Sequence, residues 1–501
     1  MAQAIATQQG VGILAEAIRA HRFDLVVGVA GRPLTPTIEV LVASGHARWV
    51  AHEATALQLA LGAAGCGKRT VVLLKQVGLN AALDVLACAA PHRTGGSAVV
   101  IAGDDPGARY SQIEGDSRLL AAYAEVPCIE PVGAGDLPTA LADAVSLSSR
   151  LRTPAVLRVT TQMMLGQPAA AERAARADCA EAAFAPALSW RTDPLGQRRN
   201  LLGALAALGE EGAAWERPGD GGVRVVAAGE PGARVLVENG VELLLVRRAF
   251  PPPIKQMAAF VARDGRALLV LEDGRPLLED QLRAHAAGRV LGRRSGHVPW
   301  AGPIDTGAAL GRAINGQRAP EPAPELVTGD PRADLSDYGS LFEDAAALGL
   351  TPMATDAGNA WAAAYLPGDP APLAYGLGSA IGVAGGIAVA TGRAAVAVIG
   401  DYGVYHAGVL ALIQVVRERL PVITVIADNG LAAYTGGQPH PGSEPQAGQS
   451  VVALEQLLAG VGLRSITTIR REEAVSLVVR PLLARLAAAH EPSALIIRSR
   501  A

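Results

Sequence analysis

The sequence predicts an α/β protein of three domains with parallel sheets. The chain has 501 residues, of which 50% are hydrophobic and 18% are charged. At roughly 100–200 residues per domain, a chain of this composition can bury about three separate cores. Short β-branched runs alternate with Ala- and Leu-rich stretches of helical period along most of the chain. This alternation is typical of parallel strands that are covered by helices on both faces.

The first domain is expected over residues 1–190. Its strands are predicted at DLVVGVAG, RTVVLLK, SAVVIAGDD and PAVLRVTT, and a connecting segment with some helix follows at residues 169–194. A central domain is expected over residues 191–325, where VRVVAAGE, VELLLVRRAF and RALLVLEDG repeat the alternation before a Pro-rich linker. The last domain, residues 326–501, follows from AAVAVIGD, PVITVIADN and SALIIRSR.

Charge and cysteine content exclude several classes of function. Lys and Arg number 44 against 47 Asp and Glu, with no long run of one sign, so neither nucleic acid nor an anionic membrane is an expected partner. The N-terminus resembles an amphipathic helix rather than a signal peptide, and no apolar run is long enough to span a bilayer. A cytoplasmic location is expected, because the four cysteines show neither disulfide nor metal spacing: Cys66, Cys88, Cys128 and Cys179.

Polar residues end two successive apolar strands near the C-terminus. Gly400-Asp401 follows AVAVI, and Asp428-Asn429 follows VITVIA. Because neighbouring parallel strands place their carboxyl ends side by side, Asp401 and Asn429 are expected to converge. Together with the carbonyl of Leu431, these oxygens suit Mg²⁺ bound to a diphosphate. The alternative is an ordinary strand-end Asp and a helix-capping Asn.

A second segment, ARWVAHEATALQLALGAAGCGKRTVVLLKQ, contains His52-Glu53 between a strand and a helix. Taken alone, Glu53 could simply be a residue favoured at a helix N-terminus. Together, the two segments resemble the thiamine diphosphate enzymes, whose metal motif reads Gly-Asp-Gly and then Asn-Asn. Here it reads Gly400-Asp401-Tyr402 and Asp428-Asn429. The resemblance implies that Glu53 hydrogen-bonds the pyrimidine ring of the cofactor and promotes loss of the thiazolium C2 proton.

Three further strings resemble the α subunit of indolepyruvate ferredoxin oxidoreductase. They are LLKQVGLNAALDVL, GDDPGARYSQIEGDSR and DNGLAAYTGGQPHPG, and the run from Thr435 to Pro441 is the most specific. The resemblance covers essentially the whole chain. Two departures stand out: the family has a His where this chain has Gln76, and no cysteine follows Cys179. The first implies lost proton transfer at that position, and the second implies that the iron–sulfur segment is lacking.

Weaker candidates surround these motifs. His406 matches a family His and could reach the substrate, although a packed His is the alternative. His440 and Gln438 lie on a Gly/Pro-rich loop that either covers the site or forms a solvated turn. Leu373, before a turn that contains Gly376, is expected to bend the cofactor, with core packing as the alternative.

The resemblance implies thiamine diphosphate and Mg²⁺ as cofactors, a homodimer, and a 2-oxo acid substrate, with an aromatic one such as indolepyruvate favoured. Expected catalytic residues are Glu53, His406, Gln76 and His440. Expected metal ligands are Asp401, Asn429 and Leu431. Expected cofactor contacts are Glu53, Leu373, Gly376, Gly400, Asp401, Tyr402, Asn429 and Leu431.

Because the sequence shows no electron acceptor, the expected reaction is non-oxidative. Decarboxylation of the 2-oxo acid would give an enamine that is protonated to an aldehyde or ligated to a second carbonyl to form an acyloin. One alternative is an oxidoreductase subunit that uses electron carriers on a separate electron-transfer subunit. A second alternative is a non-catalytic, cofactor-binding paralogue, which the replacement of His by Gln76 keeps open.

Overall fold

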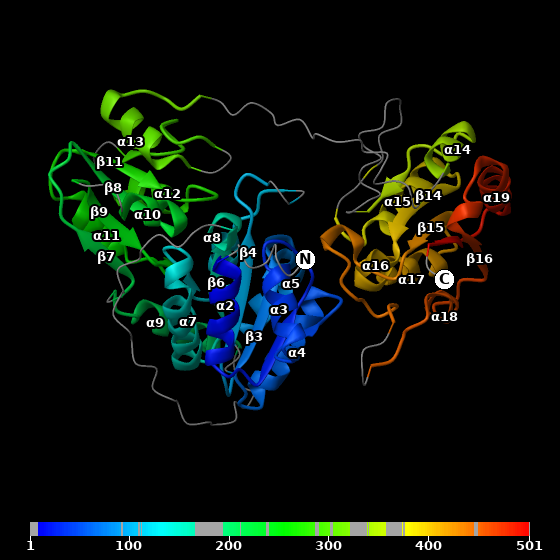
Figure 1. The fold of residues 1–501 in the computed structure, drawn as a ribbon, viewed down its shortest axis with the longest axis horizontal. Helices are drawn as coiled ribbons and strands as arrows, with labels where there is room; N and C mark the ends of the chain where they lie inside the picture. Colours follow the sequence, from blue (N-terminus) through cyan, green and yellow to red (C-terminus); the bar gives the residue numbers. More distant parts are fainter. Residues whose placement is uncertain are drawn as a thin grey trace. The chain divides into compact units, whose positions relative to one another are not determined.

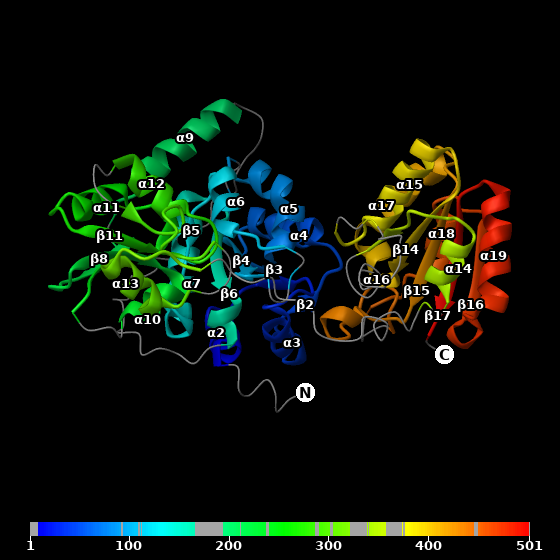
Figure 2. The same cartoon turned by 90° about the horizontal axis from the view of Figure 1, so that it is seen from above.

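Figures 1 and 2 show the computed structural model of the chain. It describes residues 9–91, 94–108, 111, 113–165, 194–210, 212–236, 240–285, 290–300, 304–320, 338, 340–356, 373, 376–444 and 449–499. The chain divides into two compact units, Met1–Pro324 and Glu325–Ala501. Within the described ranges, no helix is long and apolar enough to cross a membrane.

The first unit contains a seven-stranded sheet in the order β10-β5-β6-β4-β3-β1-β2, in which all strands except β10 run parallel. Its strands are β1 (Leu25–Gly28), β2 (Arg48–Trp49), β3 (Thr70–Lys75), β4 (Ala98–Asp104), β5 (Cys128–Ile129), β6 (Ala155–Thr160) and β10 (Arg248–Phe250). The central strands are fully buried along nearly their whole length. Their sequences are rich in Val, Ile, Leu and Ala, as expected for strands buried on both faces.

Helices cover both faces of this sheet, as the sequence predicts. One core contains residues of α2 (Gln9–Ala20), α3 (Thr35–Ala43), α7 (Leu137–Leu151) and α8 (Thr161–Leu165). The opposite core contains residues of α4 (Glu53–Gly65), α5 (Gln76–Ala89), α6 (Ser117–Tyr123) and α9 (Pro194–Ala206).

A five-stranded sheet of order β12-β11-β8-β9-β7 completes the first unit, and β7 is its antiparallel edge. Its strands are β7 (Ala214–Arg217), β8 (Val223–Ala228), β9 (Glu242–Val246), β11 (Ala267–Leu271) and β12 (Val290–Leu291). Its helices are α10 (Gly229–Leu236), α11 (Ile254–Val261), α12 (Leu277–His285) and α13 (Thr306–Asn315). The run VELLLVRRAF contains both β9 and β10, and β10 pairs with β5 of the other sheet. The expected domain boundaries near residues 190 and 325 lie outside the described residues, so the three-domain division stays a prediction.

The second unit holds a parallel sheet of order β13-β14-β15-β17-β16. Its strands are β13 (Ala354–Thr355), β14 (Ala395–Gly400), β15 (Val422–Asp428), β16 (Ser465–Arg470) and β17 (Ser493–Arg498). α14 (Leu341–Ala347) and α19 (Ser476–Ala489) pack on one face, while α15 (Ala380–Thr391), α17 (Val409–Arg417) and α18 (Leu454–Gly460) pack on the other. The predicted α/β class with parallel sheets is confirmed.

A buried ionic network joins the two sheets of the first unit. Arg118 on α6 makes a bidentate pair with Asp116, with N···O distances of 2.9 and 2.7 Å. Its Nη1 atom lies 2.7 Å from Glu272, which directly follows β11 of the other sheet. Arg158 on β6 pairs with Asp104 at 2.6 Å and also with Glu130. Because these side chains are almost fully buried, each charge depends on its partners.

We expect the Arg118→Met substitution to lower the free energy of unfolding by about 3–5 kcal/mol, because it leaves Asp116 and Glu272 buried without their counter-charge. Chemical denaturation followed by circular dichroism measures this change. Arg198→Met is the control, since it removes only an exposed ion pair with Glu125 and should leave the midpoint almost unchanged. Equal shifts for the two variants would contradict the role given to the buried network.

Candidate functional site

Three neighbouring strands of the second unit end in acidic residues at the same edge of the sheet. Asp356 follows β13, Asp401 follows β14, and Asp428 ends β15. The backbone N–H of Gly430 donates a hydrogen bond to Asp401 Oδ2 at 2.7 Å. Asp401 and the turn after Asn429 therefore converge, as the parallel strand order predicts.

Both oxygens of the Asp401 carboxylate are oriented by donors. The side chain is buried, with 2% of its surface exposed. Its Oδ1 atom accepts the N–H of Tyr402 at 2.8 Å, and His440 Nε2 lies 3.1 Å from its Oδ2 atom. A buried carboxylate needs such donors to remain charged. The carboxylate is thereby held at the edge of the sheet.

His440 is locked in one tautomer. Its Nδ1 atom accepts the N–H of Gly442 at 3.1 Å, so the ring proton lies on Nε2 and is donated to Asp401. The His440 side chain is fully buried, and Gln438 is buried as well. The solvated-turn alternative for this loop is therefore wrong. The sequence did not predict the contact between His440 and Asp401.

The loop that carries His440 is closed by its own side chains. Gln438 Oε1 accepts the Thr435 hydroxyl at 2.6 Å, while Gln438 Nε2 donates to the Thr435 carbonyl at 3.1 Å. Gly436 and Gly437 have φ angles of 121° and 86°, which glycine adopts without a side-chain clash. The two glycines and the Thr435–Gln438 bonds thus close the turn that precedes His440.

The three predicted metal ligands form a suitable donor set. Asn429 Oδ1 accepts the N–H of Leu431 at 3.0 Å, which makes an Asx turn. The Leu431 carbonyl lies in the same turn and accepts the N–H of Ala433 at 3.0 Å. A carboxylate, an amide oxygen and a carbonyl are the hard ligands that Mg²⁺ prefers. The residues present therefore fit the metal, and Gly430, bonded to Asp401, lies between Asn429 and Leu431.

Aromatic rings gather beside Asp401. A π-helical turn, Val404–Gly408, follows the short helix α16 (Asp401–Gly403). π-helical turns occur frequently at functional sites. The His406 ring lies edge-on to Tyr402 with centroids 5.9 Å apart, and the Tyr405 and His440 rings are 5.1 Å apart. His406 is buried in this turn, so both packing and a role toward substrate are compatible with its position.

Asp356 is a site residue that the sequence analysis missed. Its Oδ1 atom accepts the N–H of Gly378 at 2.6 Å, and a Cβ atom at Gly403 would clash with its Oδ2 atom. Asp356 therefore joins the segment around Gly376 to the turn that carries Asp401. The signal in the sequence is weak, because β13 contains only two residues.

Leu373 lies beside β13, where its N–H donates to Met353 and its carbonyl accepts from Thr355. Its side chain is 37% exposed, which argues against the core-packing alternative. Gly376 has a φ angle of 123°, a value that favours glycine. Residues 374 and 375 of the same turn lie outside the described residues.

In the first unit, two candidates lie at the carboxyl edge of the seven-stranded sheet. Glu53 is the buried first residue of α4, and Gln76 is the buried first residue of α5. A Cβ atom at Gly78 would lie 2.6 Å from Glu53 Oε1, so the first turn of α5 packs directly against Glu53. Gln76 Nε2 donates to the Ile113 carbonyl at 3.3 Å.

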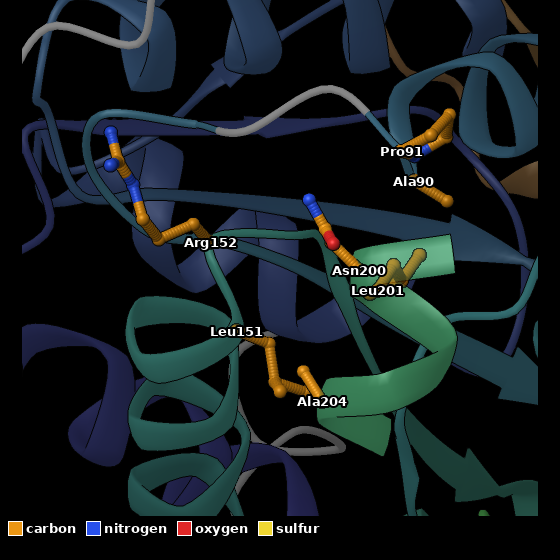
Figure 3. Close-up of a pocket in the computed structure, with 7 residues that line it drawn as sticks. All are labelled: Ala90, Pro91, Leu151, Arg152, Asn200, Leu201 and Ala204. Atoms are coloured by element: carbon orange, nitrogen blue, oxygen red, sulfur yellow. The ribbon is translucent and has the colours of Figure 1, made fainter. Parts of the chain in front are cut away.

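A small hollow lies away from this edge, where the C-terminal ends of α5 and α7 meet α9 (Figure 3). Its volume is about 40 Å³, which is enough for about a single water molecule but not for a diphosphate cofactor. It is lined by Ala90, Pro91, Leu151, Arg152, Asn200, Leu201 and Ala204.

A comparison with known protein families gives a match within the second unit. Residues 359–497 match the family described as "Thiamine pyrophosphate enzyme, C-terminal TPP binding domain". The second unit is similar to the thiamine pyrophosphate enzymes. Thiamine pyrophosphate and thiamine diphosphate are the same compound, so the resemblance drawn from the sequence is confirmed.

Curated relatives extend the similarity over most of the chain. Indolepyruvate oxidoreductase subunit IorA of Methanothermobacter marburgensis is 29% identical over 461 residues, covering 83% of this chain and 74% of that protein. The subunit of the same name from Archaeoglobus fulgidus is 26% identical over 471 residues, covering 85% and 74%. A solved 2-oxoglutarate:ferredoxin oxidoreductase from Magnetococcus marinus aligns at 14% identity and a TM-score of 0.44 over 57% of this chain and 60% of that one.

His440→Ala should lower the free energy of unfolding by about 1–3 kcal/mol, because buried Asp401 loses a donor and the Gly442 N–H loses its acceptor. Denaturant titration measures the change. His46→Ala, at an exposed histidine, is the control and should leave the midpoint in place. An unchanged midpoint in His440→Ala would argue against the tautomer and contact described above.

Proposed function

We propose that the chain is the thiamine diphosphate-binding subunit of a 2-oxo acid oxidoreductase. The observation that carries this proposal is the tie between Asp401 and Gly430, inside the segment that matches a thiamine pyrophosphate-binding domain. The curated relatives are named as oxidoreductase subunits, which favours oxidative chemistry over the decarboxylase or carboligase expected first. Their name also supports an aromatic 2-oxo acid such as indolepyruvate.

Each predicted residue receives a role in this proposal. Asp401, Asn429 and the Leu431 carbonyl hold Mg²⁺ and, through it, the diphosphate, with Gly400 and Tyr402 beside them. Leu373 and Gly376 border the rings of the cofactor. Glu53 hydrogen-bonds the pyrimidine ring. When bound, the cofactor supplies a nucleophilic carbon for attack on the ketone and an electron sink for decarboxylation.

Only a few of these side chains can exchange protons with the cofactor or the substrate in this proposal. Glu53 is buried against α5, where its carboxyl group can exchange a proton with a ring nitrogen. Gln76 carries an amide, which cannot titrate and can only donate and accept hydrogen bonds. We therefore assign proton donation toward the substrate to His406 and assign His440 to the positioning of Asp401.

Oxidation of a decarboxylated 2-oxo acid releases two electrons that need an acceptor. We propose that a separate electron-transfer subunit receives them, because the relatives are themselves named as subunits. The three described cysteines are free thiols: Cys66, Cys88 and Cys128.

One assay tests this function. The chain is incubated with thiamine diphosphate, Mg²⁺, coenzyme A and indolepyruvate or phenylpyruvate, with a viologen dye, in the presence and absence of a cluster-bearing partner. We expect dye reduction only when the partner is present. Aldehyde or acyloin formation without dye reduction would support the non-oxidative alternative, and cofactor binding without CO₂ release would support the non-catalytic paralogue.

We expect Glu53→Gln to reduce CO₂ release from 2-oxo acids by at least about 100-fold, which is the usual contribution of a positioned acid–base group. Cofactor affinity should change little, because the amide can still form a hydrogen bond. Isothermal titration calorimetry and CO₂ release measure the two effects. Glu16→Gln, at an exposed glutamate, serves as the control, and full activity in Glu53→Gln would refute the assignment.

Asp401→Ala and Asn429→Ala should each weaken Mg²⁺-dependent binding of thiamine diphosphate by at least about tenfold, because each removes one hard oxygen ligand. Calorimetry with and without a chelator measures the affinity. Glu472→Ala, an exposed carboxylate of the same unit, should bind normally. If both variants retain wild-type affinity, the metal site lies elsewhere.

We also propose that the chain forms a homodimer through α15 and α17. α15 is apolar around its whole circumference, AIGVAGGIAVAT, a composition typical of helices that are buried on all sides. Yet Val389 on α15 and Leu410 on α17 are each 66% exposed, and Ile413 is 48% exposed. The two helices pack against each other on one face of the sheet, and exposed apolar side chains gathered on neighbouring helices favour an interaction surface.

Leu410→Glu should convert the dimer to a monomer, because it places a charge in this apolar face. Light scattering after size-exclusion chromatography measures the mass. Leu477→Glu is the matched control on α19, where the side chain is 89% exposed, and it should leave the mass unchanged. A Leu410→Glu variant that remains dimeric would place the interface elsewhere.

A further inference from the structure

Two neighbouring strands of the seven-stranded sheet send their loops to opposite faces. β1 pairs with β2 on one side and with β3 on the other, and β3 pairs in turn with β4. The helix after β1, α3, contributes to one core, whereas the helix after β3, α5, contributes to the opposite core. Open α/β sheets bind ligands outside the carboxyl ends of their strands at such a switch point. The first residue of α5, Gln76, lies at this place.

Gln76 presents a buried acceptor that the described part of the chain leaves unsatisfied. Its side chain is fully buried, and no donor among the described residues reaches its Oε1 atom. Its Nε2 atom donates to the Ile113 carbonyl at 3.3 Å. This bond fixes the orientation of the amide, because the reversed amide would place two carbonyl oxygens against each other. A buried acceptor without a donor is unfavourable, so this position favours a ligand that brings a donor.

The neighbouring backbone confines the side chain of Gln76. A Cβ atom at Gly115 would lie 2.5 Å from Gln76 Cγ and 3.1 Å from its Cβ. The loop that carries Gly115 therefore packs directly on the stem of the side chain. Because the stem is confined and Nε2 is bonded, the acceptor is held at a fixed place before a ligand arrives, which lowers the entropic cost of binding.

The charged groups at this edge of the sheet favour a neutral donor over an ion. Lys75, which precedes Gln76, lies near the Asp105 carboxylate and the Arg32 guanidinium. Glu53, the buried first residue of α4, packs against the first turn of α5. Two basic side chains are accordingly matched by two acidic ones. A neutral N–H or O–H group can bond to the amide oxygen without changing this balance.

We propose that Gln76 Oε1 accepts a hydrogen bond from the side chain of the 2-oxo acid, so that the first unit selects acids whose side chain carries a neutral N–H or O–H donor. This inference rests on the proposed function. Among aromatic 2-oxo acids, the indole N–H of indolepyruvate and the hydroxyl group of 4-hydroxyphenylpyruvate are donors of this kind, whereas phenylpyruvate has none. Gln76 is thereby a specificity-determining residue, because a buried acceptor disfavours a substrate that leaves it unpaired.

The departure from the family at this position favours the substrate over the cofactor as the source of the donor. The pyrimidine of thiamine diphosphate also carries an amino group, but this ring is the same in every enzyme that binds the cofactor. Residue 76, by contrast, is Gln where the family that the chain resembles has His. Between enzymes that share one cofactor, a difference at a buried position is accounted for more directly by the substrate.

Two pairs of acids test the proposal on the wild-type chain without turnover. The chain is loaded with Mg²⁺ and 3-deazathiamine diphosphate, a cofactor analogue that cannot form the reactive carbanion, and each Kd is measured by calorimetry. One pair is indolepyruvate and its benzothiophene analogue, in which sulfur replaces the N–H. The other pair is 4-hydroxyphenylpyruvate and phenylpyruvate. We expect the donor-bearing acid of one pair to bind at least about tenfold more tightly than its partner, and that pair identifies the donor.

A variant without the acceptor completes the test. Gln76→Met keeps the length of the side chain and should bring the Kd ratio of that pair to about one. The Kd for the cofactor analogue should stay the same, which also shows that the variant is folded. Gln58→Met, at an exposed glutamine of α4, is the control and should match the wild type. If Gln76→Met keeps the preference, or weakens binding of the cofactor analogue instead, the proposal is overturned.

The outcomes separate this proposal from the function on which it rests. If the loaded wild type binds the acids equally within both pairs, the role of Gln76 is refuted and the proposed function stands. If the loaded wild type binds none of these acids, the proposed function is refuted as well.

Discussion

The arrangement of the second unit depends on how one buried carboxylate, Asp401, is satisfied. Water cannot reach this group, so its charge requires donors from the protein. The N–H of Gly430 and the Nε2–H of His440 provide them. The bond from Gly430 joins the end of β14 to the turn after β15. The bond from His440 holds the Gly-rich loop against Asp401. The turn that carries Asn429 and Leu431 is held at the sheet edge by the first of these bonds.

Buried polar groups serve two different purposes in the first unit. Around Arg118 and Arg158, charges are matched by partners within the protein and join two sheets. At the carboxyl edge of the seven-stranded sheet, by contrast, the side chain of Gln76 is buried, and no donor among the described residues reaches its Oε1 atom. Buried charges that are all matched by partners stabilise a fold. A buried polar atom without a hydrogen-bond partner at a sheet edge can instead be satisfied by a ligand.

The role inferred for Gln76 from the sequence differs from the role that the structure and the relatives support. In the sequence, Gln76 replaces a His of the family that the chain resembles, and this replacement favoured a non-oxidative or non-catalytic protein. In the structure it is a rigidly held amide at the edge that also carries Glu53. The relatives are named oxidoreductase subunits. An amide in this place is compatible with oxidative chemistry if it binds substrate and another group transfers the proton.

The sequence by itself determined the parallel α/β architecture and the meeting of Asp401 with the turn after β15, because hydrophobic periodicity marks strands and helices, and parallel strands align their carboxyl ends. It did not reveal β10 leaving the central segment for the first sheet, the Asp356 bond to Gly378, or the contact of His440 with Asp401. Those features join residues 22 to more than 100 positions apart. Local patterns specify which faces are buried, but only tertiary packing decides which polar groups meet there.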